Sequence, residues 1–150
     1  MGIRGLGSEL PPFDCLVGAE FHHVGFAGTR IEHEIDFFSL LGYRPEGPEF
    51  IDPEQGIRGI FLVGDGPRIE LLENTPGSET LTPWLKAGSR IYHLAFTVPD
   101  IHQAIEVAHG AGAILLRKPA PSVAFQGRLI SFVKFRIRLV VEFIDNADAG

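Results

Sequence analysis

The chain has 150 residues, enough for one domain with a substantial core or for two small modules fused together. Apolar residues make up 45% of it and charged residues 21%, which is the composition of an ordinary globular protein. Its net charge of −6 argues against nucleic acid as a partner, because binding to phosphate backbones relies on clustered lysine and arginine.

Cysteine content and hydropathy indicate a cytoplasmic protein. Cys15 stands alone, which excludes a disulfide framework and a cysteine-based zinc site and fits a reducing compartment. Residues 1–20 lack the apolar core of a signal peptide, and no run approaches the roughly 20 apolar residues that span a bilayer. We therefore expect no membrane partner.

The chain begins with residues 1–19, which are rich in glycine and proline and are expected to form an irregular arm. Residues 20–27 then have the pattern of a strand, with His23 and Gly25 on one face and His22 on the other. The small residues beside His23 would leave room for a ligand.

A helix is expected next, because Thr29 and Glu32 have the spacing of a capping box and Gly42 is a natural stop. Its apolar stripe would consist of Ile31, Ile35, Phe38 and Leu41. The turn-rich segment 43–56 is expected to hold a short irregular strand. The next expected elements are two antiparallel strands at 57–63 and 68–72 and a short helix at 82–86.

The second half repeats this plan. A strand at 90–98 is followed by Asp100 and Gln103, which have the spacing of a second capping box, and by a helix that ends near 110–112. The stripe of this helix would consist of Ile101, Ala104, Ile105 and Ala108. Strands are expected at 113–117, 129–134 and 138–144, with a loop at 118–128.

The order β-α-β-β-β therefore occurs twice, and this internal repetition is the strongest organisational signal in the sequence. We predict an α+β fold in which two βαβββ modules, residues 20–74 and 90–145, form a mixed β-sheet around a cleft, with helices outside. Residues 75–89 would link the modules within a single domain spanning 20–145, followed by a tail, 146–150.

Each module carries a histidine in its first strand and a glutamate in its last: His23 with Glu70, and His93 with Glu142. The two spacings are similar, at 47 and 49 residues. A charged residue in an apolar strand is costly unless it is paired or binds a metal. The repetition therefore favours one four-ligand metal site shared by both modules. Such nitrogen and oxygen ligands suit Co, Ni, Zn, Mn or Fe without distinguishing among them.

Simpler roles stay open for several of these residues. Glu70 and Glu142 could be edge-strand charges that face water and block aggregation. His22, on the opposite face from His23, is expected to be structural. The other histidines are expected to be solvated on helices: His33, His102 and His109.

Six short stretches carry a resemblance to known proteins: residues 22–26 (HHVGF), 52–57 (DPEQGI), 69–73 (IELLE), 84–86 (WLK), 92–96 (YHLAF) and 99–101 (PDI). Through them the chain resembles the vicinal oxygen chelate superfamily, which includes glyoxalases, methylmalonyl-CoA epimerases, extradiol dioxygenases and fosfomycin or bleomycin resistance proteins. It is most similar to the methylmalonyl-CoA epimerase family. The resemblance implies that one divalent metal ion is bound by His23, Glu70, His93 and Glu142.

The chain departs from the epimerase pattern in three places. Gly59 stands where some epimerases carry a catalytic glutamate. Residues 134–138 replace the usual turn before the last strand, and residues 121–127 alter the glycine-rich substrate loop. Because Gly59 cannot act as a base, Glu142 is the first candidate for that role and Glu70 the second.

The implied chemistry is proton transfer next to a carbonyl group, with the metal as Lewis acid and a carboxylate as base. Methylmalonyl-CoA epimerase-like isomerisation is the leading prediction. A glyoxalase I-like lactoylglutathione lyase is the enzyme alternative, and a non-catalytic, resistance-type binding protein is the third. The partner would be a small molecule such as an acyl-CoA thioester, held with help from Gln55, Lys134 and Arg136. A homodimer is expected, and the sequence leaves open whether the modules pair within one chain or swap between two.

Overall fold

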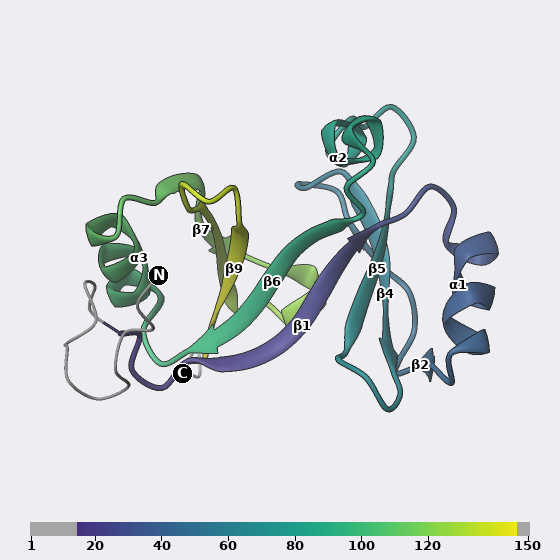
Figure 1. Ribbon diagram of the computed structural model, residues 1–150, viewed down its shortest axis with the longest axis horizontal. Coiled ribbons are helices and arrows are strands. Elements are labelled where there is room, and N and C mark those ends of the chain that lie inside the picture. The colour runs from purple at the N-terminus through teal and green to yellow at the C-terminus, as the bar shows by residue number, and fades with distance from the viewer. Residues whose placement is uncertain (1–14, 147–150) are drawn as a thin grey trace, which may run out of the picture.

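The computed structural model describes residues 15–146 (Figure 1). Residues 1–14 of the expected arm and 147–150 of the expected tail lie outside the described residues. The helices are α1 Ile31–Leu40, α2 Thr82–Ala87 and α3 Ile101–Gly110, with a short 3-10 helix, η1, at Val123–Phe125. The strands are β1 Glu20–Ala27, β2 Arg44–Pro45, β3 Phe50–Asp52, β4 Ile57–Val63, β5 Ile69–Asn74, β6 Ile91–Val98, β7 Ile114–Pro121, β8 Leu129–Lys134 and β9 Val140–Asp145. Within this part of the chain, no helix is both long and apolar enough to cross a membrane.

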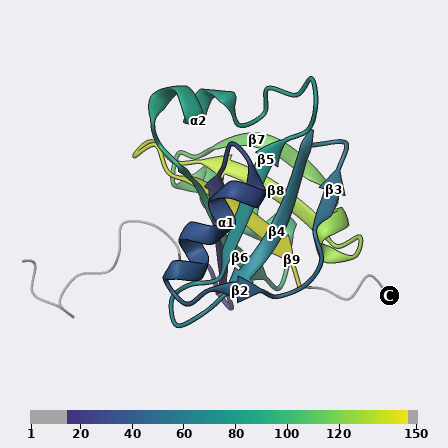
Figure 2. The same ribbon diagram turned by 90° about the vertical axis from the view of Figure 1, so that its right-hand side faces the viewer.

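The strands of the described residues form one mixed sheet in the order β2-β4-β5-β1-β6-β9-β8-β7, with β3 paired to β4. β1 and β6 are antiparallel neighbours at its centre, and each pairs in parallel with the last strand of its own half, β5 or β9. Figure 1 shows a twisted sheet with α1 at one end and α3 at the other, and in Figure 2 the α1 end faces the viewer. The predicted α+β fold, with a mixed sheet and helices outside, is confirmed.

Each of the two longer helices packs its apolar side chains against its own half of the sheet. The first cluster contains Ile31 of α1 with Ile60, Leu62, Ile69 and Leu71 of β4 and β5. The second contains Ile101, Ala104 and Ala108 of α3 with Val133, Val141 and Phe143 of β8 and β9. Full burial of one aliphatic or aromatic side chain stabilises a fold by about 1.5–3 kcal/mol, so these clusters hold β5 and β9 firmly beside the central strands.

The first predicted capping box is wrong, and only half of the second is confirmed. The N–H and hydroxyl of Thr29 donate to Glu34, at 2.8 and 2.6 Å, instead of pairing with Glu32. The helix begins at Ile31, two residues after Thr29. The side chain that reaches Thr29 therefore belongs to Glu34, two positions after Glu32. Leu41 lies beyond the last turn and is 70% exposed, so it does not belong to the buried stripe. At α3, the Asp100 side chain accepts hydrogen bonds from the N–H groups of His102 and Gln103, as predicted, but the Gln103 side chain makes no bond back to Asp100.

Two segments near the C-terminal end differ from the predicted boundaries. The segment 118–128, expected to be a loop, is largely regular. β7 continues to Pro121, with two register shifts in its pairing with β8, and the 3-10 helix η1 follows it. The last strand begins at Val140 instead of 138. The chain turns tightly before it: the N–H of Phe135 donates to the carbonyl of Leu139 at 2.9 Å, and Arg138 has a positive φ of 67°.

Candidate metal centre

The four residues singled out by the repeat meet in the middle of the sheet. His23, Glu70, His93 and Glu142 come from β1, β5, β6 and β9 and are 0%, 5%, 1% and 2% exposed. Strand pairing brings them to one face, because Gly25 lies opposite both Glu70 and His93, and Ala95 lies opposite both His23 and Glu142. In the structure, the two halves meet along the paired strands β1 and β6.

The ligand atoms are spaced as they would be around a cation. Nε2 of His23 lies 3.1 Å from Nε2 of His93. Oε1 of Glu70 lies 3.3 and 3.4 Å from these two nitrogens, and Oε1 of Glu142 lies 3.2 and 3.3 Å from them. Four ligands held about 2.0–2.2 Å from a shared tetrahedral centre are about 3.3–3.6 Å apart. The arrangement therefore fits a metal ion in both atom type and separation.

Electrostatics inside the cluster also favour a cation. Burial opposes protonation of His23, but the charge of Glu70 and hydrogen bonds to both glutamates outweigh it and raise the pKa of His23 to about 9. Burial also acts to lower the pKa of His93, but the same two carboxylates outweigh it and raise that pKa. Burial alone would raise the pKa of the Glu70 and Glu142 carboxyl groups, yet the histidines hold both below the usual range. Oε1 of Glu142 is buried and faces both ring nitrogens, at 3.2 and 3.3 Å.

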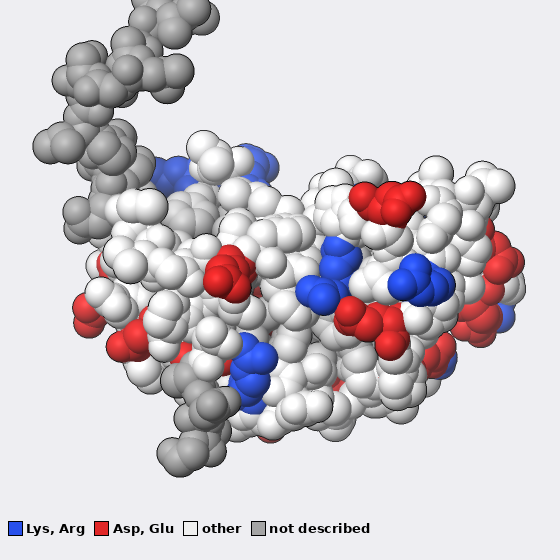
Figure 3. Space-filling model, turned by 90° about the horizontal axis from the view of Figure 1, so that it is seen from below, with Lys and Arg blue, Asp and Glu red and all other residues white. Residues whose placement is uncertain are grey.

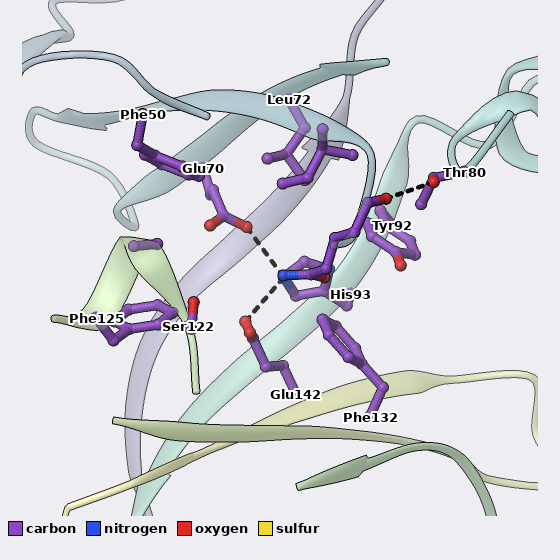
Figure 4. Close-up of a pocket in the computed structure, with 13 residues that line it drawn as sticks. Phe50, Glu70, Leu72, Thr80, Tyr92, His93, Ser122, Phe125, Phe132 and Glu142 are labelled. Atoms are coloured by element: carbon purple, nitrogen blue, oxygen red, sulfur yellow. Dashed lines mark hydrogen bonds and ion pairs between the residues drawn. The ribbon is translucent and has the colours of Figure 1, made fainter. Parts of the chain in front are cut away.

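A narrow cavity of about 10 Å³, room for about one water molecule, adjoins Glu70, His93 and Glu142 (Figure 4). Its wall is mostly apolar and aromatic, from Phe50, Ile57, Leu72, Tyr92, Ala124, Phe125 and Phe132. The polar groups among its lining are Gln55, Thr80 and Ser122. The hydroxyl of Ser122 is buried without a hydrogen-bond partner, so it is free to contact a ligand.

The structure brings one of the three predicted substrate contacts to this cavity. Gln55 lines it, with its side-chain amide donating to Asp52 at 2.7 Å. Lys134 and Arg136 are not among the lining residues. Arg136 lies in the turn after β8 and borders a separate surface hollow at the end of α3. The position of this turn depends on tertiary packing, which the spacing of the basic residues did not reveal.

The space beside His23 has a different use from the one predicted. A Cβ atom at Gly25 would overlap the imidazole ring of His93. The absence of a side chain at this position therefore makes room for the second histidine, not for a ligand. The sequence signal, a glycine two residues after the histidine, was visible, but its partner could be identified only once β1 and β6 were paired.

Simple alternation along the strand predicted that His22 points away from the site, and this prediction is wrong. The pairing of β1 with β6 is shifted between Phe21 and His23, so His22 occupies a β-bulge. Its Nδ1 lies 2.8 Å from Nδ1 of His23, and its ring packs edge-on against Phe61 and Phe125. Burial, together with the neighbouring His23, lowers the pKa of His22 to about 4.

The wall at Gly59 has no room for a side chain. A Cβ there would lie 2.7 Å from the ring of Phe50 and 2.8 Å from Cδ2 of Leu72. Both of these side chains line the cavity. The position is therefore occupied by apolar atoms and supplies no acid or base.

Comparisons with known proteins agree with this architecture. No curated protein is significantly similar to the chain in sequence. Among solved structures, a hypothetical protein of Bacillus halodurans C-125 superposes with a TM-score of 0.75 at 22% identity, over 89% of this chain and 98% of that one. Methylmalonyl-CoA epimerase of Mycobacterium tuberculosis superposes with a TM-score of 0.70 at 24% identity, over 85% and 87%.

A variant of Streptomyces coelicolor methylmalonyl-CoA epimerase in complex with 2-nitronate-propionyl-CoA gives a TM-score of 0.66 at 21% identity, covering 86% of this chain and 95% of that one. At these identities, the structures show a shared fold. The model of the Glyoxalase/Bleomycin resistance protein/Dioxygenase superfamily matches residues 22–132, most of the chain. The protein is thus a member of this superfamily, the vicinal oxygen chelate proteins.

Proposed function

We propose that the protein is a metal-dependent isomerase that removes a proton from the carbon next to a carbonyl group. The observation that carries this proposal is the convergence of two buried imidazoles and two buried carboxylates at mutual distances suited to one cation. His23, Glu70, His93 and Glu142 would hold one divalent ion, for which Co, Ni, Zn, Mn and Fe are all suitable. Such an ion would stabilise negative charge on a substrate oxygen while the neighbouring proton leaves.

Glu142 is the first candidate for the base and Glu70 the second. Both carboxylates border the cavity, so either can reach a carbon atom held beside them. Oε1 of Glu142 lies 3.2 and 3.3 Å from Nε2 of His23 and His93, so Glu142 would loosen from the metal as it accepts the proton. The aromatic wall, with Phe50, Phe125 and Phe132, would exclude water and strengthen these electrostatic interactions.

Epimerisation of an acyl-CoA thioester is the first specific candidate. It is supported by the shared fold of methylmalonyl-CoA epimerases, one of which was solved in complex with methylmalonyl-CoA. In this reaction the proton would return to the opposite face of the same carbon. Glu70 and Glu142 belong to different halves of the sheet, so they could serve the two faces in place of the base that is missing at Gly59.

A glyoxalase-type lyase reaction on a glutathione adduct is the second candidate, because it requires no site for the CoA phosphates. A CoA phosphate needs free cations. Four arginines are paired with glutamates, Arg58, Arg68, Arg90 and Arg117, whereas Lys118, Lys134 and Arg136 form no ion pair among the described residues. On the face seen in Figure 3, basic and acidic side chains lie interspersed, without one broad basic area. A glutathione adduct carries no phosphate and makes no such demand.

Deuterium exchange tests the proposed function. Metal-loaded protein in D2O would be incubated with methylmalonyl-CoA and, separately, with the hemithioacetal of methylglyoxal and glutathione. We expect deuterium at the α-carbon of one of these substrates, and its loss in Glu142→Gln. Glu106→Gln, on the exposed face of α3, is the matched control and should retain exchange. Metal-loaded protein that binds these molecules without any exchange would instead be a binding protein.

We also propose a cytoplasmic homodimer. The lone cysteine supports the reducing compartment. Apolar side chains at the end of α1 support an interface, since Phe37, Leu40 and Leu41 are 69%, 83% and 70% exposed. Sedimentation should give a dimer for the unmodified protein and a monomer for Leu40→Lys; a monomer in both cases would contradict the proposal.

A further inference from the structure

We propose that His22 is a positioning residue, which holds His23 in the ring orientation and tautomer that present Nε2 to the metal. This inference rests on the proposed metal site and deepens it. His23 and His93 would then be held in different ways, because Nδ1 of His93 makes no equivalent hydrogen bond.

The backbone places His22 beside His23 by a built-in irregularity. Phe21 pairs with Phe96 and His23 pairs with Ala95, which leaves His22 as the extra residue of a bulge. The guanidinium group of Arg68 donates to the carbonyl of His22 at 3.0 Å, fixing the bulged peptide. A bulge re-aims a side chain that alternation would send to the other face.

Aromatic packing then fixes the His22 ring. Its centroid lies 5.9 Å from that of Phe61 and 5.4 Å from that of Phe125, with both rings nearly perpendicular to it. Phe125 and Phe61 also pack against the His23 ring. The two imidazoles are therefore held in one aromatic enclosure, with Nδ1 facing Nδ1 at 2.8 Å.

The hydrogen bond between these nitrogens selects the tautomer of His23. A neutral imidazole that binds a metal through Nε2 must carry its proton on Nδ1. That Nδ1–H needs an acceptor, and Nδ1 of His22 lies at hydrogen-bonding distance. His22 then carries its own proton on Nε2 and acts as the acceptor. A partner of this kind orients a metal-binding histidine and raises its basicity.

The second half of the sheet has the same bulge without the same bond. Tyr92 precedes His93 at a register shift of β6 and packs on the His93 ring at a centroid distance of 4.6 Å. A tyrosine ring placed there leaves Nδ1 of His93 buried without a hydrogen-bond partner. The repeat therefore supports one ligand by a hydrogen bond and the other by packing alone.

Two substitutions separate the hydrogen bond from packing. His22→Phe keeps an aromatic ring against Phe61 and Phe125 but removes the acceptor. His22→Asn loses the ring but can place an amide oxygen close to the position of Nδ1. His102→Phe, at an exposed site on α3, is the control for the same exchange elsewhere. Each purified protein would be titrated with Co2+ in competition with a chelator, and thermal unfolding of the metal-free forms would verify folding.

We expect His22→Phe to weaken Co2+ binding about 10–100-fold, the usual cost of losing such a partner. His22→Asn should stay within about threefold of the unmodified protein, and His102→Phe should match it. Equal affinity in His22→Phe and the unmodified protein would overturn the inference alone. So would a larger loss in His22→Asn than in His22→Phe, because packing would then be the cause. Failure of the unmodified protein to bind Co2+ would overturn the proposed function, and the inference with it.

Discussion

Gly25 and His93 face each other across β1 and β6, and the imidazole ring of His93 fills the space that a side chain at position 25 would need. The candidate metal centre thus depends on a residue that offers no ligand atom. Here the rings of His23 and His93 lie side by side, with the His93 ring in the gap that Gly25 leaves.

Gly25→Ala tests this dependence. The added methyl group must displace the ring of His93, because no flexible chain end is there to move aside. We expect the loss of at least about tenfold in metal affinity, with a stability cost of about 1–3 kcal/mol from overpacking. Gly47→Ala is the matched control, since a Cβ there meets no atom within 4 Å. Unchanged metal affinity in Gly25→Ala would show that the ring can occupy another position.

The metal-free protein should lose stability between about pH 6.5 and 9. A histidine has an ordinary pKa of about 6.5 in the unfolded chain, and His23 has a pKa of about 9 in the folded protein. A pKa that is raised by folding stabilises the fold below the unfolded value, and this contribution disappears as the pH rises through the folded value. The pKa values of Glu70 and Glu142 are shifted downward, so their titration lies below this window.

Thermal unfolding at several pH values measures this effect. The metal-free protein should show a fall in Tm on the order of a few °C across the window. Metal-loaded protein should show a smaller fall, because the ion takes the place of the protons on the ring nitrogens. A flat profile for the metal-free protein would contradict the raised pKa of His23.

Filling the wall at Gly59 should destabilise the protein unless Phe50 is shortened. Gly59→Ala places a methyl group against the Phe50 ring and Leu72, and we expect a cost of about 1–3 kcal/mol in unfolding free energy. Combining it with Phe50→Ala should give less destabilisation than the sum of the two single changes, because each relieves the other. Strict additivity in denaturant unfolding would show that the two side chains do not share this space.

Much of the sheet could be predicted because its strands have clear boundaries in the sequence. β4 runs from Ile57 to Val63, as predicted, between Gly56 and Gly64. β8 also has its predicted bounds, 129–134. The convergence of the four candidate ligands followed from the repeat, since equivalent strands of two like modules meet at the centre of one sheet. Their role as metal ligands stays a prediction.

Features that depend on the exact register between distant strands could not be predicted. The bulge at His22 exists because β1 and β6 pair with a register shift, and no local pattern of residues in the sequence indicates it. The use of Gly25 as space for His93 has the same origin. Arg136 lies away from the cavity, in the turn after β8, where it borders a hollow beside the end of α3.

Metal content tests the central claim most directly. The purified protein and His93→Ala would be examined by elemental analysis, before and after exposure to Co, Ni, Zn and Mn salts. We predict about one divalent ion per chain in the unmodified protein, and its loss in His93→Ala, because four converging ligands at these separations suit a single ion. An unmodified protein that holds no divalent ion under any of these conditions would contradict the account.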